Sequence, residues 1–74
     1  MTIKEFQFII ELQKEFEFSY NKVNYNLTYD RDSKGNLIIV FGERYFGKPY
    51  SSFGQLMNTA RVENHFLKEI LKDI

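Results

Sequence analysis

Two neighbouring segments of the chain decide the fold: Glu15-Phe16-Glu17-Phe18-Ser19-Tyr20 and Tyr25-Asn26-Leu27-Thr28-Tyr29. In both segments apolar or aromatic side chains alternate with polar ones, and a period of two residues is typical of a half-buried β-strand. Asn21-Lys22-Val23-Asn24 lies between them and supplies a turn. We therefore expect an antiparallel hairpin that has one aromatic face and one polar face.

A third strand is predicted at Leu37-Ile38-Ile39-Val40-Phe41, after a loop from Asp30 to Asn36 that is rich in Asp, Ser, Gly and Asn. The alternation places one set of side chains from the three strands on a single face, which we expect to be the core face: Phe16, Phe18, Tyr20, Tyr25, Leu27, Tyr29, Leu37, Ile39 and Phe41. Ile38 and Val40 make the opposite face of the third strand apolar as well, which normally marks an interior strand.

Something should therefore cover Ile38 and Val40. The candidates are a fourth strand between Arg44 and Tyr50, a helix, or another subunit. Gly47 and Pro49 weaken the fourth strand and would confine it to an edge of the sheet.

Helical periodicity lies on both sides of the predicted strands. Thr2-Ile3-Lys4-Glu5 matches a capping box, and apolar residues follow it at helical spacing. Phe8 and Leu12 widen the apolar stripe beyond one face, so we expect the first helix to be deeply buried or to contact two neighbours.

A second capping-box match, Ser52-Phe53-Gly54-Gln55, begins the C-terminal part of the chain. Helical spacing then continues over residues 53–73, either as one long helix or as two. Glu63 and Asn64 interrupt the apolar pattern, and this interruption favours two helices, with Asn64 as a cap for the second.

The composition limits how such a chain stays folded. It has 74 residues, five Tyr, eight Phe, no Cys and a formal net charge of zero. We expect one domain spanning residues 1–74, stabilised by a dense apolar core or by a partner, because disulfides and thiolate zinc sites need cysteine. The predicted fold is α+β: an N-terminal helix, a three- to four-stranded antiparallel meander, and one broken or two C-terminal helices packed on one sheet face.

Several classes of site find no support in the sequence. The Asp30–Asn36 loop begins like a calcium loop, but Lys34 stands where a ligand is needed, and His65 has neither a thiol nor a second imidazole beside it for zinc. Gly47-Lys48 lacks the rest of a phosphate-binding loop. We expect no enzyme activity, cofactor or metal. The absence of a signal-peptide pattern and of a long apolar run predicts a cytoplasmic protein without membrane contact.

The pattern resembles a group of small uncharacterised proteins of low-GC Gram-positive bacteria and their phages or mobile elements. The resemblance is carried by core-packing segments over most of the chain: Phe16–Tyr20, Tyr25-Asn26-Leu27, Tyr50–Phe53 with Leu56-Met57, and Phe66–Leu71. It implies an α+β fold and no known activity. That group would have glycines near Val23-Asn24 and near Glu63-Asn64, and this sequence has neither.

Two functional hypotheses remain. The first is a non-catalytic interaction or accessory module that binds a protein partner or a second copy of itself through exposed apolar side chains, with Phe8, Leu12, Ile38 and Val40 as candidates. The alternative is a nucleic-acid-associated protein of a mobile element. Its candidate residues, which would have to converge on one face, are Lys22, Arg31, Lys34, Arg44, Lys48 and Arg61.

Overall fold

The computed structural model describes all 74 residues, and its elements alternate between helices and strands. They follow in the order α1 (Ile3–Glu11), β1 (Phe16–Tyr20), β2 (Val23–Arg31), β3 (Leu37–Glu43), β4 (Lys48–Tyr50), α2 (Phe53–Thr59), β5 (Arg61–Val62), β6 (His65–Phe66), α3 (Leu67–Ile70) and the 3₁₀ turn η1 (Leu71–Asp73). The predicted α+β class and element order are confirmed.

Strands β1 to β4 form an antiparallel meander in chain order. The register aligns Phe16 with Leu27 and Leu27 with Phe41, so the predicted core-facing set does share one face of the sheet. The fourth strand forms, but it has only three residues, and Pro49 lies within it opposite Val40. It occupies the edge, where the missing amide proton of proline is tolerated.

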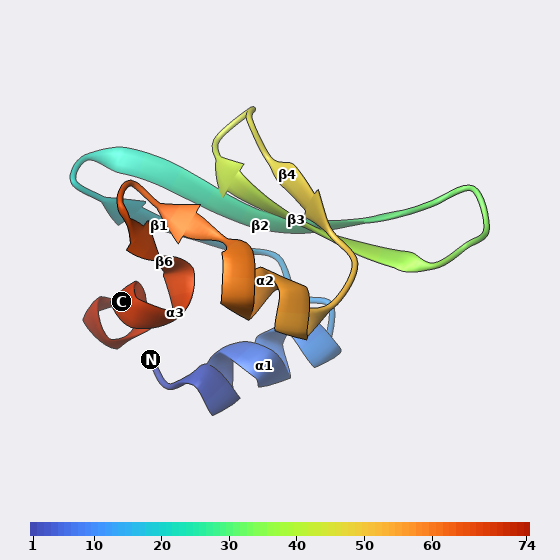
Figure 1. Cartoon of the computed structure of the whole chain (residues 1–74), viewed down its shortest axis with the longest axis horizontal. Coiled ribbons are helices and arrows are strands. Elements are labelled where there is room, and N and C mark those ends of the chain that lie inside the picture. Colours follow the sequence, from blue (N-terminus) through green and yellow to red (C-terminus); the bar gives the residue numbers. More distant parts are fainter.

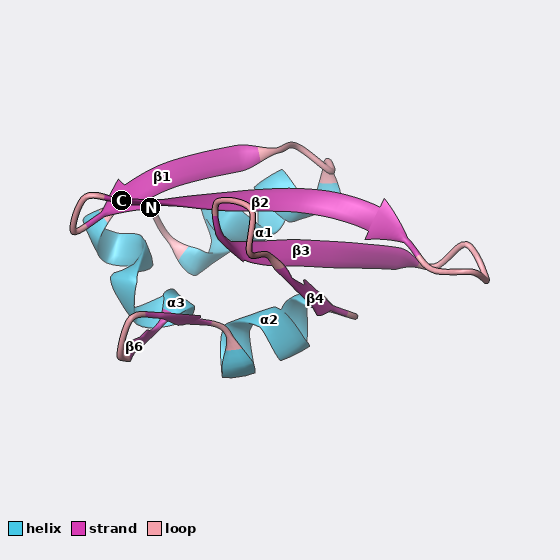
Figure 2. Cartoon of the chain, turned by 90° about the horizontal axis from the view of Figure 1, so that it is seen from above, coloured by secondary structure: helices cyan, strands magenta, loops and turns pink.

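All the helices lie on one side of the sheet, below it in Figure 1, and in the view from above α1 lies behind β2 and β3 (Figure 2). The core between the layers contains 13 buried side chains, all of them apolar or aromatic. They come from the sheet and from every helix: Phe6, Ile10, Tyr25, Leu27, Ile39, Phe41, Leu56, Met57, Ala60, Val62, Leu67, Ile70 and Leu71. The rings of Phe18 (β1), Tyr25 (β2) and Phe41 (β3) form a cluster in which each ring contacts both others, with centroid separations of 5.4, 6.0 and 6.1 Å.

The predicted break in the C-terminal helical region is present, but its form differs from the prediction. Arg61–Val62 and His65–Phe66 pair as a two-stranded ribbon between α2 and α3. Asn64 does not cap a helix, because Phe66 occupies the position before α3. His65 therefore lies on a strand, exposed to solvent, and not in the first turn of a helix.

Both ends of α1 have defined caps. The Thr2 hydroxyl accepts from the Glu5 amide at 3.0 Å and the Glu5 carboxylate accepts from the Thr2 amide at 2.9 Å, which completes the predicted capping box. At the other end the amides of Gln13 and Lys14 bond back to Ile10 and Ile9. This is a Schellman motif, and Gln13 occupies its left-handed position with φ 53°.

The β2–β3 hairpin extends past the helices, at the right of Figure 1. Its loop is closed by its own side chains: the Asp32 carboxylate accepts from the amides of Lys34 and Asn36 at 2.9 and 2.8 Å. These bonds hold the pKa of Asp32 below its ordinary value, the Asn36 amide having the largest effect. The Asp32 carboxylate thus closes the loop, as expected for an Asx turn.

None of the helices combines the length and apolar character that a membrane-spanning segment needs.

Candidate interaction site

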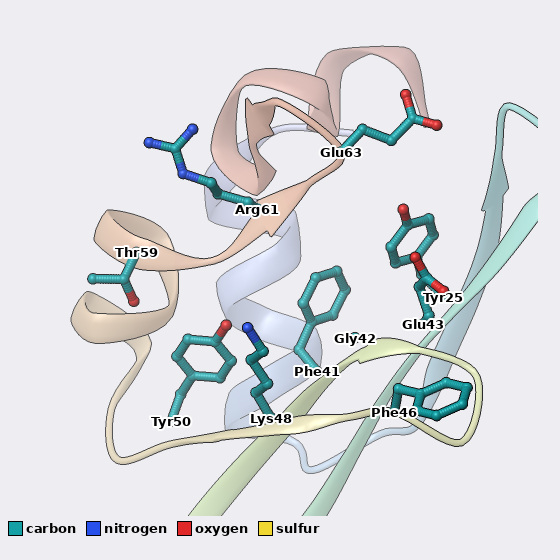
Figure 3. Close-up of a pocket in the computed structure, with 10 residues that line it drawn as sticks. All are labelled: Tyr25, Phe41, Gly42, Glu43, Phe46, Lys48, Tyr50, Thr59, Arg61 and Glu63. Atoms are coloured by element: carbon teal, nitrogen blue, oxygen red, sulfur yellow. The ribbon is translucent and has the colours of Figure 1, made fainter.

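A cavity of about 550 Å³ lies at one end of the sheet, between the β3–β4 hairpin and the β5–β6 ribbon (Figure 3). Its walls come from four strands, α2 and two connections. The lining residues are Tyr25, Phe41, Gly42, Glu43, Phe46, Lys48, Tyr50, Thr59, Arg61 and Glu63. Phe41 contributes the apolar floor, and polar groups surround it.

The polar groups of the cavity divide into a basic and an acidic side. Lys48 and Tyr50 project from the same face of β4 into the basic side (Figure 3). On the acidic side, Tyr25 lies near Glu43 and Glu63. Burial raises the pKa of Tyr25, and the charges of these two carboxylates raise it further.

The two tyrosine hydroxyls of the cavity stay protonated near neutral pH. Burial also raises the pKa of Tyr50, and a tyrosine ordinarily titrates near 10. Neither is therefore a base at neutral pH. The Tyr50 hydroxyl can donate a hydrogen bond to a ligand, whereas Tyr25 is only 3% exposed and its hydroxyl lies against the backbone of Glu63. The Thr59 hydroxyl donates to the carbonyl of Gln55 at 2.6 Å, within α2.

Arg61 contributes less to the cavity than its position in the lining suggests. Its guanidinium lies over the Phe66 ring, 4.4 Å from the centroid, and is directed away from Lys48 and Tyr50 (Figure 3). The Lys68 ammonium lies 5.7 Å from the same centroid. Phe66 therefore holds two cations outside the cavity by cation–π contacts.

The rim of the cavity carries the most exposed aromatic side chains of the chain. Tyr45 is 85% exposed and Phe46 is 74% exposed. Together with Arg44 they form a short connection between β3 and β4, which we call the aromatic loop (Arg44-Tyr45-Phe46). The Arg44 guanidinium lies over the Tyr45 ring, 5.2 Å from its centroid.

The aromatic loop is tied to the neighbouring strands by backbone hydrogen bonds. The Arg44 amide donates to the Asn24 carbonyl at 2.9 Å, and the Phe46 amide donates to the Glu43 carbonyl at 2.8 Å. Tyr45 has φ 73°, in the left-handed region, which costs an L-residue about 1–2 kcal/mol. Two aromatic rings are thus displayed to water from a hydrogen-bonded loop whose backbone is strained at Tyr45.

Two glycines permit this close packing. A Cβ on Gly42 would lie 2.7 Å from the Phe46 carbonyl oxygen, and one on Gly47 would lie 2.5 Å from a methyl of Val40. The backbone after the aromatic loop therefore crosses directly over Val40. Val40, one of the two apolar residues on the outer face of β3, is therefore covered in part by Gly47 and β4 of the same chain.

The four apolar residues predicted to make contacts fall into two separate groups. Phe8 and Leu12 are exposed on α1, at 60% and 48%. Ile38 and Val40 are half-buried on the outer face of the sheet, which no helix covers. Ile38 pairs with Asp30 in the extended part of the β2–β3 hairpin, whereas Val40 lies under Gly47.

The six predicted basic residues do not converge on one face. Arg31 is the last residue of β2, and Lys34 lies in the loop that follows it. The nine residues of β2 have a length of roughly 25–30 Å, and this length separates Arg31 and Lys34 from the other four basic residues. Lys22, Arg44, Lys48 and Arg61 occur at the end of the sheet that carries the cavity, interspersed with Glu43 and Glu63. The structure therefore brings four of the six to one end, in a mixed-charge environment.

Of the aromatic loop, only Arg44 is among the residues predicted from the sequence, as a candidate for nucleic-acid binding. Tyr45 and Phe46 are not, because the sequence pattern indicates only a weak strand between Arg44 and Tyr50. The available signal was a pair of aromatic residues between a cation and a glycine, with no alternation.

No cluster of three or more His, Cys, Asp or Glu side chains that could hold a metal ion is present. Comparisons with protein-family profiles, curated protein sequences and solved structures give no match.

Proposed function

We propose that the chain is a non-catalytic interaction module and that it binds a protein partner through the aromatic loop and the adjoining cavity. The observation that carries this proposal is the exposure of Tyr45 and Phe46 side by side on a hydrogen-bonded loop. Rigid aromatic side chains supply large contact areas at small entropic cost, and tyrosine and arginine are enriched among residues that dominate binding.

The cavity beside the loop supports the same proposal. A partner that covers Tyr45 and Phe46 would also reach Lys48 and Tyr50, whose side chains enter the cavity (Figure 3). The exposed ring of Phe46 beside the polar groups of the cavity gives the arrangement of a binding site, in which apolar area supplies affinity and a few polar groups fix orientation.

The experiment selects binders from a random peptide display library and compares them on three forms of the protein. The Y45S/F46S double variant should lose at least about tenfold in affinity, since residues of this kind usually contribute more than about 1.4 kcal/mol. Both side chains are exposed, so the fold should persist. Phe8→Ser is the matched control, because it also replaces an exposed aromatic residue but lies on α1.

Peptides that bind the wild type and the Y45S/F46S variant equally would contradict the proposal. A loss of binding in Phe8→Ser of the same size would move the site to α1. Circular dichroism and thermal melts of each variant establish that the compared proteins are folded.

A nucleic-acid-associated role, in the setting of a mobile element, is the second candidate. It is favoured by one observation: Arg44 and Lys48 flank the two exposed rings, and the Arg44 amide is bonded to Asn24, close to Lys22 in the neighbouring turn. Aromatic rings with nearby cations can stack on the bases of a single strand. Fluorescence anisotropy with a labelled oligonucleotide at two salt concentrations tests it, and binding must be salt-dependent and lost in Y45S/F46S.

A further inference from the structure

Helix α1 carries a second exposed surface, on the side opposite the core. Phe6 and Ile10 are buried, whereas Phe8 and Leu12 are exposed. At about 100° per residue, Phe8 points almost directly away from the buried side of the helix. A shallow groove beside Phe8 is lined by apolar parts of Met1 and Ile9, which enlarge the surface.

Opposite charges lie on either side of Phe8. Lys4 precedes it by four residues and Glu11 follows it by three, and both are exposed. The seven-residue separation places Lys4 and Glu11 within about 20° of each other around the helix. Along this flank of Phe8 the surface therefore has a cation at one end and an anion at the other. Glu5, which also lines the groove, lies on the opposite flank and accepts a hydrogen bond from the Thr2 amide.

The stability of α1 does not account for these charges. The residues three and four positions after Lys4 are Gln7 and Phe8, and the same two residues precede Glu11 at those spacings, so neither charge has an opposite partner within the helix. Lys14 follows Glu11 by three residues but lies beyond the end of α1. A cation in the first turn and an anion in the last turn also oppose the helix dipole. Lys4 and Glu11 therefore do not stabilise α1, and their placement is better explained by contact with a partner surface.

We propose that a second copy of this chain docks on this surface, with α1 packed against α1 about a two-fold axis. In an antiparallel two-fold arrangement the residues of the two helices run in opposite directions along the contact. A residue on one side of the contact line meets a partner residue on that same side. Phe8 then faces the partner's Phe8 across the axis, and Lys4 faces the partner's Glu11. Both copies form this pair, so the surface is complementary to itself in charge and in apolar contact.

The association should be weak. Helix α1 has nine residues, a length of about 13 Å, and a contact of this size is well below the roughly 800 Å² per partner of a stable interface. We expect a dissociation constant on the order of 0.1–1 mM, so self-association is measured from about 10 μM to about 2 mM protein.

Charge reversal gives a specific test by sedimentation equilibrium. Lys4→Glu alone places Glu against the partner's Glu11, and Glu11→Lys alone places Lys against the partner's Lys4. Each single variant should self-associate at least about tenfold more weakly than the wild type. An equimolar mixture of the two should associate at least as strongly as the wild type, because every pair is again of opposite charge. The double variant K4E/E11K should also recover.

A matched mixture controls for general attraction between oppositely charged proteins. Glu17→Lys and Lys34→Glu make the same net charge changes at exposed positions on β1 and in the β2–β3 loop, away from α1. This mixture should associate no more than the wild type. The proposal is overturned if the wild type stays monomeric to about 2 mM, or if the two mixtures behave alike. The Y45S/F46S variant should dimerise normally, which keeps this test independent of the aromatic loop.

Discussion

The left-handed residue that ends α1 gives the sharpest test of the structure. Gln13 has φ 53° at the position of the Schellman motif where glycine is preferred. Gln7 is the same residue type, exposed in the interior of the same helix. Glycine should therefore have opposite effects at the two positions, although the chemical change is identical.

The magnitudes follow from the backbone. A left-handed conformation costs an L-residue about 1–2 kcal/mol, whereas glycine costs about 0.4–1 kcal/mol through the greater freedom of the unfolded chain. Gln13→Gly should raise the free energy of unfolding by about 0.5–1 kcal/mol. In a domain of this size that corresponds to roughly 2–8 °C in Tm. Gln7→Gly should lower the free energy of unfolding by about 0.5–1 kcal/mol, the ordinary cost of glycine inside a helix.

Urea denaturation followed by circular dichroism measures both changes. The slope of the unfolding free energy with urea should stay constant, so that the midpoints report stability alone. Gln13→Asn adds a graded point between glutamine and glycine, because asparagine tolerates the left-handed region better than most residues. If Gln13→Gly destabilises the protein as much as Gln7→Gly does, α1 does not end in the motif described.

Four further outcomes follow from the same structure. Lys22→Gly should stabilise by about 1 kcal/mol in thermal melts, because Lys22 has φ 67° in a two-residue hairpin turn that prefers Asn-Gly. Gly47→Ala should cost about 1–3 kcal/mol, and most of that cost should vanish in a Val40→Ala background if the clash with Val40 is its cause. The pKa of Glu5 is lowered by its hydrogen bond from the Thr2 amide and by the Thr2 side chain. The ionised Glu5 therefore stabilises the fold above the ordinary carboxyl range, and this stabilisation is lost as the pH falls through that range. Glu5→Gln should make the unfolding free energy depend less on pH below about pH 4. Tyr45→Gly should raise Tm while weakening any binding that requires the aromatic loop.

The sheet was predictable because burial fixes its register. A shift of one residue in β1 or β2 would turn Phe16, Phe18 and Leu27 toward water, so the alternation leaves one arrangement. The β5–β6 ribbon was not predictable, because strands of two residues are too short to show a period. Val62 and Phe66 are also four residues apart, a spacing that fits a helix equally well.

The candidate site was harder to predict than the fold. The cavity draws its walls from β2, β3, β4, α2 and the ribbon, and their meeting depends on tertiary packing that no local pattern records. The exposure of Tyr45 and Phe46 could not be read from their residue types, because aromatic residues near a strand are usually buried. Phe8 and Leu12 were identifiable, because they exceed the apolar stripe that one helix face needs.

The left-handed residues distinguish the aromatic loop from the other turns. Gln13, Asn21, Lys22 and Glu63 also have positive φ without being glycine, and each serves a turn or a helix end. Tyr45 differs from them because its strain presents two rings to water between close-packed glycines. A connection that only joined β3 to β4 would need neither the strain nor the exposed rings. Strain and apolar exposure are both unfavourable to a free domain, and their coincidence at one loop is the reason we propose a partner that covers it.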